Sequence, residues 1–534
     1  MRVRAMRVLE HLPRPLVLAL GIVAGLAVGA PIGGAMGAER GPAGDRVVVD
    51  NERGLVFGQP YDGDWSRIGI YLGLPSYADT FKAMAPEAIK ISQGRFHHFS
   101  LADNRQYAYF PVDRLRAYEA REVAAGRPPL FVTATHEGRK RPVYFVWSLG
   151  IGDGTDGAPG APAAEWMQAV NVADERFIQF WIREYARKVL QGAGLPNTWI
   201  GLDNCAFQYA LYGVLDRTNR LAHGVPWDQP FARDEGQFLE SVKHFFRRVK
   251  EVAPDLRLIC NAGEPTDPAR FRDVYADIGG IVEEDMLYHY KPSEWSRQEV
   301  YRRHLNAAWL ASTGKVGLFS FHTLPRDETL VDRLRTAFVH YLILRGANFF
   351  FAPQFDVPEV SPALYADMRA ALGFPIGPAT SEAVAGMGDG HRLYTRPTEG
   401  GVVFLNWSGA TRTIDLPTGR RHYDRSGRPI TRLTMRDMTG DYVVFAPGPR
   451  VARPAVNPRG RPPGPGRGPV VVRLSSATPG ARIFYTTDGS EPTAASPRYT
   501  RPLTLVRTTR VKARAVLPGR LDSFVSAASF VLTD

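Results

Sequence analysis

The chain has 534 residues, of which 44% are hydrophobic and 11% aromatic, so it holds enough apolar material for a sizeable core and is not a disordered protein. It contains only two cysteines, which excludes a disulfide-rich scaffold. The net charge of +12 is concentrated at the two ends, because residues 1–38 and 450–534 are rich in arginine and the body between them is near neutral.

The N-terminus has the pattern of an export signal. Residues 1–15 carry four arginines, an apolar run follows over 16–30, and small residues at 35–38 suit a processing site. We therefore expect a signal peptide over 1–38 and a folded part outside the cytoplasm, whether secreted, periplasmic or at the cell surface. An uncleaved membrane anchor is the alternative, since the apolar run is about as long as a short membrane-spanning helix.

Strand-like and helix-like segments alternate from residue 67 to residue 374, which is typical of an α/β fold with a parallel sheet. Amphipathic segments over 174–190, 237–252 and 330–344 predict helices. Eight strands separated by helices favour a (β/α)8 TIM barrel over 39–376, with its active site at the C-terminal ends of the strands. The expected strands are 68–72, 88–92, 130–134, 199–203, 256–260, 280–284, 316–321 and 348–352.

The rest of the chain has an all-β pattern. Short alternating runs with Gly, Pro and Asp turns predict a small β-sandwich over 377–446, packed on the barrel. Residues 447–469, rich in Pro, Gly and Arg, are expected to form an extended linker. Residues 470–534 again show β-branched runs, so the predicted fold is a TIM barrel followed by two small all-β sandwich domains.

Two of the predicted barrel strands end in carboxylates. Residues 198–204 read Thr-Trp-Ile-Gly-Leu-Asp-Asn, and residues 279–285 read Gly-Gly-Ile-Val-Glu-Glu-Asp. A charged carboxylate at the end of a buried strand is costly unless it is paired, hydrogen-bonded or used in chemistry. The separation of Asp203 and Glu284 leaves room for two strand-plus-helix units, so the two groups fit alternate strands of one sheet. Glycoside hydrolysis requires such a carboxyl pair.

Other polar and aromatic residues lie at or near predicted strand ends, where they would hold sugar hydroxyls or stack on sugar faces. Each of them alone is more often part of a loop or a core. The candidate substrate-binding residues at or near strand ends are Tyr71, Gln93, His136, Asn204, Asn261, His322 and Gln354, and Trp147 and Tyr288 are further candidates as stacking platforms for sugar rings.

Other chemistries have less support. His97 and His98 are adjacent but have no third ligand at a metal-site spacing, and the glycine-rich stretches lack the lysine of a phosphate loop. We therefore expect no metal and no other cofactor. Cys205 and Cys260 would come close on adjacent strands, which suits either a single disulfide or two buried free thiols.

The last part of the chain resembles a known module. Residues 481–493 read Ala-Arg-Ile-Phe-Tyr-Thr-Thr-Asp-Gly-Ser-Glu-Pro-Thr, and Ser-Pro-Arg-Tyr follows at 496–499. Together with Thr-Arg-Val-Lys-Ala-Arg-Ala at 509–515, this resembles the chitobiase/β-hexosaminidase C-terminal type of β-sandwich, which accompanies many secreted carbohydrate-active enzymes. Asp488-Gly489 is a tight-turn signal, so the motif is also consistent with a purely structural role.

The body more loosely resembles a family of barrel glycosidases that includes endo-α-1,4-polygalactosaminidases. That family carries a catalytic Asp in a G-h-x-L-D-N motif on strand four and a partner Glu in a G-h-h-x-E motif on strand six. The resemblance implies that Asp203 is the nucleophile or base and that Glu284 is the acid/base, with Glu283 as the choice if the match shifts by one residue. The structural alternative is that Asp203 hydrogen-bonds the following loop and that the two glutamates pair with arginines.

We therefore expect an exported glycoside hydrolase that acts on a polysaccharide, with amino-sugar exopolysaccharides among the candidates. A noncatalytic carbohydrate-binding protein on the same barrel is the alternative. The basic C-terminal region also suits attachment to an anionic polymer or a membrane surface, or an ordinary solvated surface; no nucleic-acid partner is expected.

Overall fold

The computed structural model describes part of the chain, and the predicted signal peptide lies outside that part. No helix among the described residues is long and apolar enough to cross a membrane. The described residues are 53–56, 68–73, 82, 84, 88–94, 98–100, 112–145, 167–188, 190, 197–202, 205, 209, 212–217, 221–229, 233–261, 267–283, 286, 296–321, 330–353, 361–458 and 469–532.

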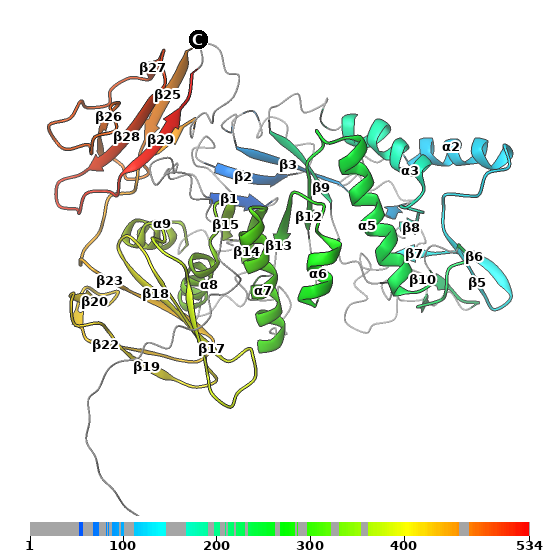
Figure 1. Ribbon diagram of the computed structural model, residues 1–534, viewed down its shortest axis with the longest axis horizontal. Coiled ribbons are helices and arrows are strands. Elements are labelled where there is room, and N and C mark those ends of the chain that lie inside the picture. The colour runs from blue at the N-terminus through cyan, green and yellow to red at the C-terminus, as the bar shows by residue number, and fades with distance from the viewer. Residues whose placement is uncertain are drawn as a thin grey trace, which may run out of the picture.

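Parallel strands form the centre of the described structure (Figure 1). Each strand pairs with the next central strand along the chain, and β15 pairs back with β1, so the sheet closes on itself. The strands are β1 (Arg53–Val56), β2 (Ile68–Gly73), β3 (Ile89–Gly94), β9 (Thr198–Leu202), β12 (Leu258–Asn261), β13 (Gly280–Glu283), β14 (Val316–Phe321) and β15 (Phe349–Pro353).

Helices α5, α6, α7 and α8 lie along the outside of this sheet (Figure 1). The expected helices over 174–190, 237–252 and 330–344 are confirmed, the first as α3 continued by the π-helix η6. The helices of this region are α3 (Glu175–Phe180), η6 (Trp181–Ala186), α5 (Glu235–Val252), α6 (Pro268–Val274), α7 (Arg297–Thr313), α8 (Leu330–Leu344) and α9 (Ser361–Leu372).

Helix α7 has sequence signals at both ends. The Ser296 hydroxyl accepts a hydrogen bond from the Glu299 backbone N–H, and the Glu299 carboxylate accepts one from the Ser296 backbone N–H at 2.7 Å. This capping box satisfies two N–H groups that have no partner within the helix. Gly314, with a φ of 70°, ends the helix in the left-handed region that favours glycine.

Alternate residues of the central strands face two different cores, as strand geometry requires. Trp199, Ile259 and Val282 belong to a cluster inside the closed sheet, whereas Cys260 and Ile281 pack in the larger core between sheet and helices. Inside the sheet the packing is tight where the strands begin: a Cβ added at Gly279 would lie 2.7 Å from the Trp199 ring. The interior cluster comprises Trp199, Ile259, Val282, Val316, Leu318, Phe350 and Ala352.

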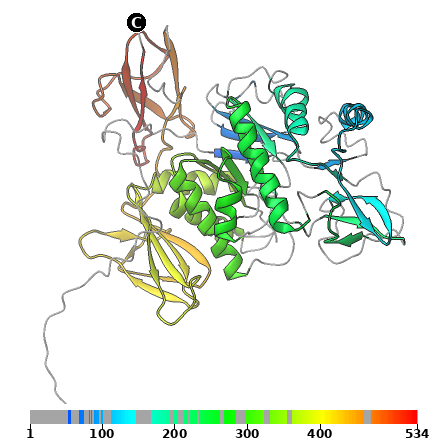
Figure 2. The ribbon, with the colours of Figure 1, turned by 45° about the vertical axis from the view of Figure 1, so that its right-hand side comes forward.

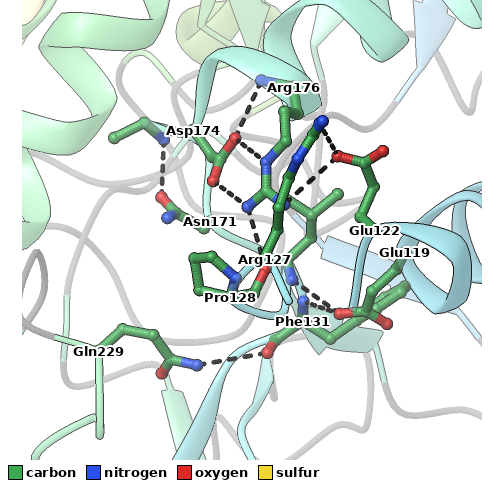
Figure 3. Close-up of polar contacts among 11 residues, drawn as sticks. Glu119, Glu122, Arg127, Pro128, Phe131, Asn171, Asp174, Arg176 and Gln229 are labelled. Carbon is green, nitrogen blue, oxygen red and sulfur yellow. Dashed lines mark hydrogen bonds and ion pairs between the residues drawn. The ribbon is translucent and has the colours of Figure 1, made fainter. Parts of the chain in front are cut away.

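Seven of the expected central strands are confirmed, and the one expected at 130–134 is wrong. The Val132 backbone N–H donates to the Ala169 carbonyl at 2.9 Å, so this segment pairs with residues of a different sheet. Figure 3 shows the Glu119 carboxylate accepting the backbone N–H groups of Leu130 and Phe131, each at 2.7 Å. A short apolar run fits a strand in any sheet, so its sequence does not reveal its partner. The missing central strand is β1.

Segments that follow β3 and β9 form a second, antiparallel sheet beside the barrel (Figure 2). Because these segments leave the C-terminal ends of β3 and β9, the sheet is attached at the edge where barrel active sites are built. Its strands are β4 (His98–Ser100), β7 (Tyr144–Phe145), β8 (Met167–Ala169), β10 (Tyr212–Leu215) and β11 (Leu221–His223), and it is accompanied by helix α2 (Val112–Ala124) and by the hairpin of β5 (Thr133–His136) and β6 (Arg139–Pro142).

An all-β unit packs on helix α8, as the sequence predicts for residues 377–446. A Cβ added at Gly440 would lie 2.9 Å from the Val339 side chain, which shows how closely β23 approaches α8. The Arg396 guanidinium donates to the carbonyls of Leu342 and Ile343 at the end of α8, at 2.8 and 2.9 Å. The strands are β16 (Thr380–Ala383), β17 (Arg392–Pro397), β18 (Gly401–Trp407), β19 (Arg412–Asp415), β20 (His422–Tyr423), β21 (Pro429–Ile430), β22 (Arg432–Met435) and β23 (Thr439–Val444).

The C-terminal unit consists of two three-stranded sheets that enclose their own apolar core. Val451 and Val456 are buried in that core and β24 pairs with β25, so residues 451–457 belong to this unit and are not linker as predicted. In the sequence these two valines lie among prolines and arginines, so the composition of 447–469 did not reveal that they belong to a core. The strands are β24 (Ala455–Asn457), β25 (Val470–Ser475), β26 (Arg482–Thr486), β27 (Leu503–Leu505), β28 (Thr509–Val516) and β29 (Ser526–Phe530).

Candidate active site

The proposed catalytic residues come directly after two described strands. Strand β9 ends at Leu202 and strand β13 at Glu283, and both strands pair with β12, which lies between them. The expectation of alternate strands in one parallel sheet is therefore confirmed for the strands themselves. Several candidates lie outside the described residues, and their roles stay predictions: Trp147, Asp203, Asn204, Glu284, Tyr288, His322 and Gln354.

Glu283 is buried on the helix side of the sheet and is paired with an arginine. Its carboxylate accepts a hydrogen bond from the Arg303 guanidinium of α7, and the exposed fractions of the two side chains are only 9% and 1%. A buried ion pair is stable only while both partners are present, because either charge alone would be strongly destabilising. For Glu283 the structure thus has the arrangement that the structural alternative predicts.

Asn261 lies at the C-terminal edge of the sheet and faces its interior. It is the last residue of β12, it is buried, and it is in register with the interior residue Val282 of β13. Directly paired residues of neighbouring strands lie on the same face, so the Asn261 amide faces the same way. Its backbone carbonyl accepts the Cys205 N–H at 3.0 Å. An amide at this position offers both donors and an acceptor for sugar hydroxyls.

Tyr71 and Gln93 lie on the expected strands, and the structure gives their backbone registers. Gln93 on β3 is in register with Gly201 of β9, two residues before Asp203. Tyr71 on β2 is in register with Lys90 of β3, a buried lysine whose ammonium donates to the Ala88 carbonyl at 2.9 Å. Contacts of Tyr71 and Gln93 with a substrate stay predictions.

His136 does not lie at the end of a central strand, which corrects the predicted position. It is the last residue of β5 and pairs with Arg139 across a two-residue turn. This hairpin lies at the far side of the inserted sheet from the central strands (Figure 1). The prediction followed from the assignment of 130–134 to the barrel, and it is wrong for the same reason.

The two cysteines are buried and are not joined in a disulfide. The Cys205 thiol donates to the Leu202 carbonyl at 3.2 Å, and the Tyr275 hydroxyl donates to the Cys205 carbonyl at 2.5 Å. Of the two sequence-based alternatives, the structure has the free thiols. Among the described residues, no group of three or more His, Cys, Asp or Glu side chains is placed to hold a metal ion.

The residues that anchor the chain beyond β9 were not predicted from the sequence. The Glu235 carboxylate accepts the Tyr209 backbone N–H at 2.7 Å and is also paired with the Arg270 guanidinium. The Tyr209 hydroxyl accepts the Trp227 backbone N–H at 3.1 Å, and burial raises the pKa of Tyr209 to about 12. Four aromatic rings pack around this point. The density of aromatic residues between 207 and 238 was the available signal.

Comparison with known proteins identifies one segment of the chain. Residues 462–527 match the family model of the chitobiase/beta-hexosaminidase C-terminal domain, in agreement with the resemblance seen in the sequence. No curated protein matches the chain.

Several solved structures are similar at low identity. The glycoside hydrolase domain of PelA from Pseudomonas aeruginosa is 13% identical, covers 58% of this chain and 94% of its own, and has a TM-score of 0.31. Amy13B from Eubacterium rectale is 10% identical, with coverages of 76% and 97% and a TM-score of 0.41. The alpha-amylase from H. orenii is 10% identical, with coverages of 75% and 93% and a TM-score of 0.35. Likeness at this level carries no conclusion about the activity of this chain.

Proposed function

We propose that this protein is an exported glycoside hydrolase that cleaves a polysaccharide with Asp203 and Glu284, at the C-terminal edge of a complete (β/α)8 barrel. The proposal rests on one observation, the alternation of side chains along β9 and β13. Trp199 on β9 and Val282 on β13 face the interior of the sheet. If the period of two continues, Asp203 and Glu284 face the interior as well, whereas Glu283 faces the helices.

The register of the strands supports a convergence of the two carboxyl groups. Leu202 is in register with Cys260, and Asn261 is in register with Val282. If this register continues by one residue, Asp203 would lie level with Asn261, and Glu284 would lie two residues beyond Val282. Neighbouring strands are about 4.8 Å apart and a strand rises about 3.3 Å per residue, so backbone positions that are two strands apart and offset by two residues are separated by about 12 Å. Side chains that project inward shorten that distance. Such a separation suits the carboxyl pair of a glycosidase.

In this proposal the two carboxyl groups divide the chemistry. Glu284 protonates the oxygen of the leaving sugar, and Asp203 either attacks the anomeric carbon or activates a water molecule. Asn261, buried at the same edge, is placed to hold a sugar hydroxyl. The match of residues 462–527 supports a role among carbohydrate-active proteins. The predicted signal peptide would deliver the enzyme to polysaccharides outside the cytoplasm.

Activity measurements on matched variants test the proposal. The protein without residues 1–38 is incubated with a panel of bacterial polysaccharides, including an amino-sugar polymer, and new reducing ends are measured. Asp203→Asn and Glu284→Gln are expected to lower kcat by about a thousandfold or more while the melting temperature is kept, because each removes a reacting group.

Glu283→Gln is the matched control. It removes the charge that compensates Arg303, so it should lower the melting temperature and leave the kcat of the folded enzyme within about threefold. Wild-type kcat in both Asp203→Asn and Glu284→Gln would refute the assignment. Polysaccharide that is bound but never cleaved by the wild-type protein would establish the noncatalytic alternative.

A further inference from the structure

We propose that the outer face of the sheet β26-β28-β29 binds an acidic polysaccharide, as a site separate from the candidate active site. This cationic face is formed by Arg482 and Phe484 on β26, Arg498 in the adjacent segment, and Arg510, Lys512 and Arg514 on β28. The proposal goes beyond glycoside hydrolysis and does not depend on the catalytic pair.

The strand alternation gathers these cations on one face. Ile483 on β26 and Val511, Ala513 and Ala515 on β28 are buried in the core of the unit. Residues of the opposite parity therefore point away from that core. Successive side chains on one face of a strand are about 6.7 Å apart, so β28 presents a row of three cations at a regular spacing.

The charge of this unit is not balanced by its own carboxylates. Residues 469–532 contain nine Lys or Arg against three Asp or Glu. Glu491 pairs with Lys512 at 2.6 Å, and Asp522 lies 3.9 Å from Arg514. The third acid, Asp488, accepts the Ser490 hydroxyl at 2.6 Å within its own turn.

Three arginines of the cationic face have no such compensation. Among the residues that the structure describes, no carboxylate lies within 4 Å of the guanidinium groups of Arg482, Arg498 or Arg510. Arg482 and Arg498 are exposed. The guanidinium groups of Arg482 and Arg498 are therefore available for an external anion, whereas Arg510 is partly buried.

An aromatic ring lies between two of the arginines. Phe484 is paired with Arg514 on one side and with Arg498 on the other, so the three side chains form a row across the sheet. Phe484 is partly exposed and does not belong to the core cluster. Of the two guanidinium groups that flank the ring, Arg498 has no described carboxylate partner and Arg514 has only Asp522, at 3.9 Å. This arrangement suits a sugar ring that carries carboxylates, because the apolar ring contacts the sugar face while the guanidinium groups bind carboxylate oxygens.

Other polyanions fit this row less well. Single-stranded nucleic acids bind through several aromatic rings on which successive bases stack, and the cationic face has one ring. A membrane surface calls for apolar residues beside the cations. The exposed valines of the unit, Val471 and Val506, lie on β25 and after β27, away from the row. An acidic polysaccharide is therefore the partner that we infer.

Binding measurements test this inference in the Glu284→Gln background, so that turnover does not consume the probe and a failure of the proposed reaction does not affect the result. The probe is polygalacturonate, and dextran is the neutral control. We expect retention on polygalacturonate that weakens with added salt, and none on dextran. The double variant Arg498→Gln/Arg514→Gln should raise the Kd roughly tenfold, and Phe484→Ala severalfold even at high salt.

Arg473→Gln is the control, because Arg473 is an exposed arginine of β25, on the other sheet of the unit. It should change the Kd by less than about twofold. It is compared with the single variants Arg498→Gln and Arg514→Gln, because each of the three variants removes one positive charge. Three results would overturn the inference: no retention on polygalacturonate, equal loss in all three single variants, or tighter binding to duplex DNA or to phosphatidylserine vesicles than to polygalacturonate.

Discussion

Helix α7 carries two adjacent buried polar residues, Arg303 and His304, and they are stabilised differently by the regions on the two sides of the helix. Arg303 faces the central sheet and pairs with Glu283 as two opposite charges. His304 faces the all-β unit, and its Nδ1 lies 2.9 Å from Nε2 of His340 on α8, with the two rings stacked. The sheet side therefore depends on two charges that stay together, and the other side depends on two rings that stay neutral.

The surroundings explain why the histidines are neutral. Burial lowers the pKa of His304 to about 3, and the nearby Arg392 guanidinium of β17 adds to the effect. Burial also lowers the pKa of His340, and His304 beside it lowers it further. The rings of Tyr394 and Trp407 enclose the pair, and no described carboxylate is hydrogen-bonded to either histidine. A histidinium ion formed here would be buried without a carboxylate to compensate its charge.

The largest expected effect comes from breaking the charged pair. Arg303→Met should lower the free energy of unfolding by about 3–5 kcal/mol, because it leaves the Glu283 carboxylate buried without its counter-charge. Urea unfolding measures the loss. Arg302→Met, at the half-exposed neighbouring position of α7, is the control and should cost less than about 1 kcal/mol. A loss below 1 kcal/mol in Arg303→Met would contradict the view that this pair needs both partners.

The neutral pair should make stability depend on pH. The unfolded chain binds protons at its histidines below an ordinary pKa of about 6.5, whereas the folded chain excludes them until far lower pH. The contribution of the two neutral histidines to the free energy of unfolding is therefore fully present above pH 6.5. It is lost as the pH falls, by about 1 kcal/mol per histidine at pH 5.5.

Urea unfolding at pH 7.5 and 5.5 measures this dependence. The double variant His304→Gln/His340→Gln should be less stable than wild type at pH 7.5 and should lose less on acidification. The control variant His223→Gln, at an exposed position, should not alter the pH dependence of the free energy of unfolding. An unchanged acid loss in the double variant would show that other groups cause it.

The smallest expected effect concerns a hydroxyl beside the neutral pair. The Tyr394 hydroxyl oxygen is buried and has no hydrogen-bond partner among the described residues. Its removal in Tyr394→Phe should therefore leave the free energy of unfolding unchanged or raise it by up to about 1 kcal/mol, because an unsatisfied buried group costs free energy. Thermal and urea unfolding would measure the change. A loss above 1 kcal/mol would instead mean that a bound water or another group satisfies this oxygen and is part of the pair.

The parts of the site that depend on neighbouring residues in the chain could be predicted, and the parts that depend on distant residues could not. The strands that precede Asp203 and Glu284 were predictable, because a buried parallel strand reads as a short apolar run. The choice between Glu283 and Glu284 was not, because it depends on which face of β13 each residue occupies and on an arginine twenty residues further along the chain. His136 was misplaced for a related reason, since its strand pairs within the inserted region.

The sequence alone determined the kinds and approximate positions of most elements, because periodicity, caps and turn residues act over a few positions. It also determined the C-terminal module, through a local motif that matches a family model. Only the tertiary structure decided that Arg53–Val56 closes the sheet, that Val456 belongs to a core and that α7 separates a charged pair from a neutral one. Those outcomes depend on contacts between residues far apart in the chain, and no local pattern records which distant partner a side chain will meet.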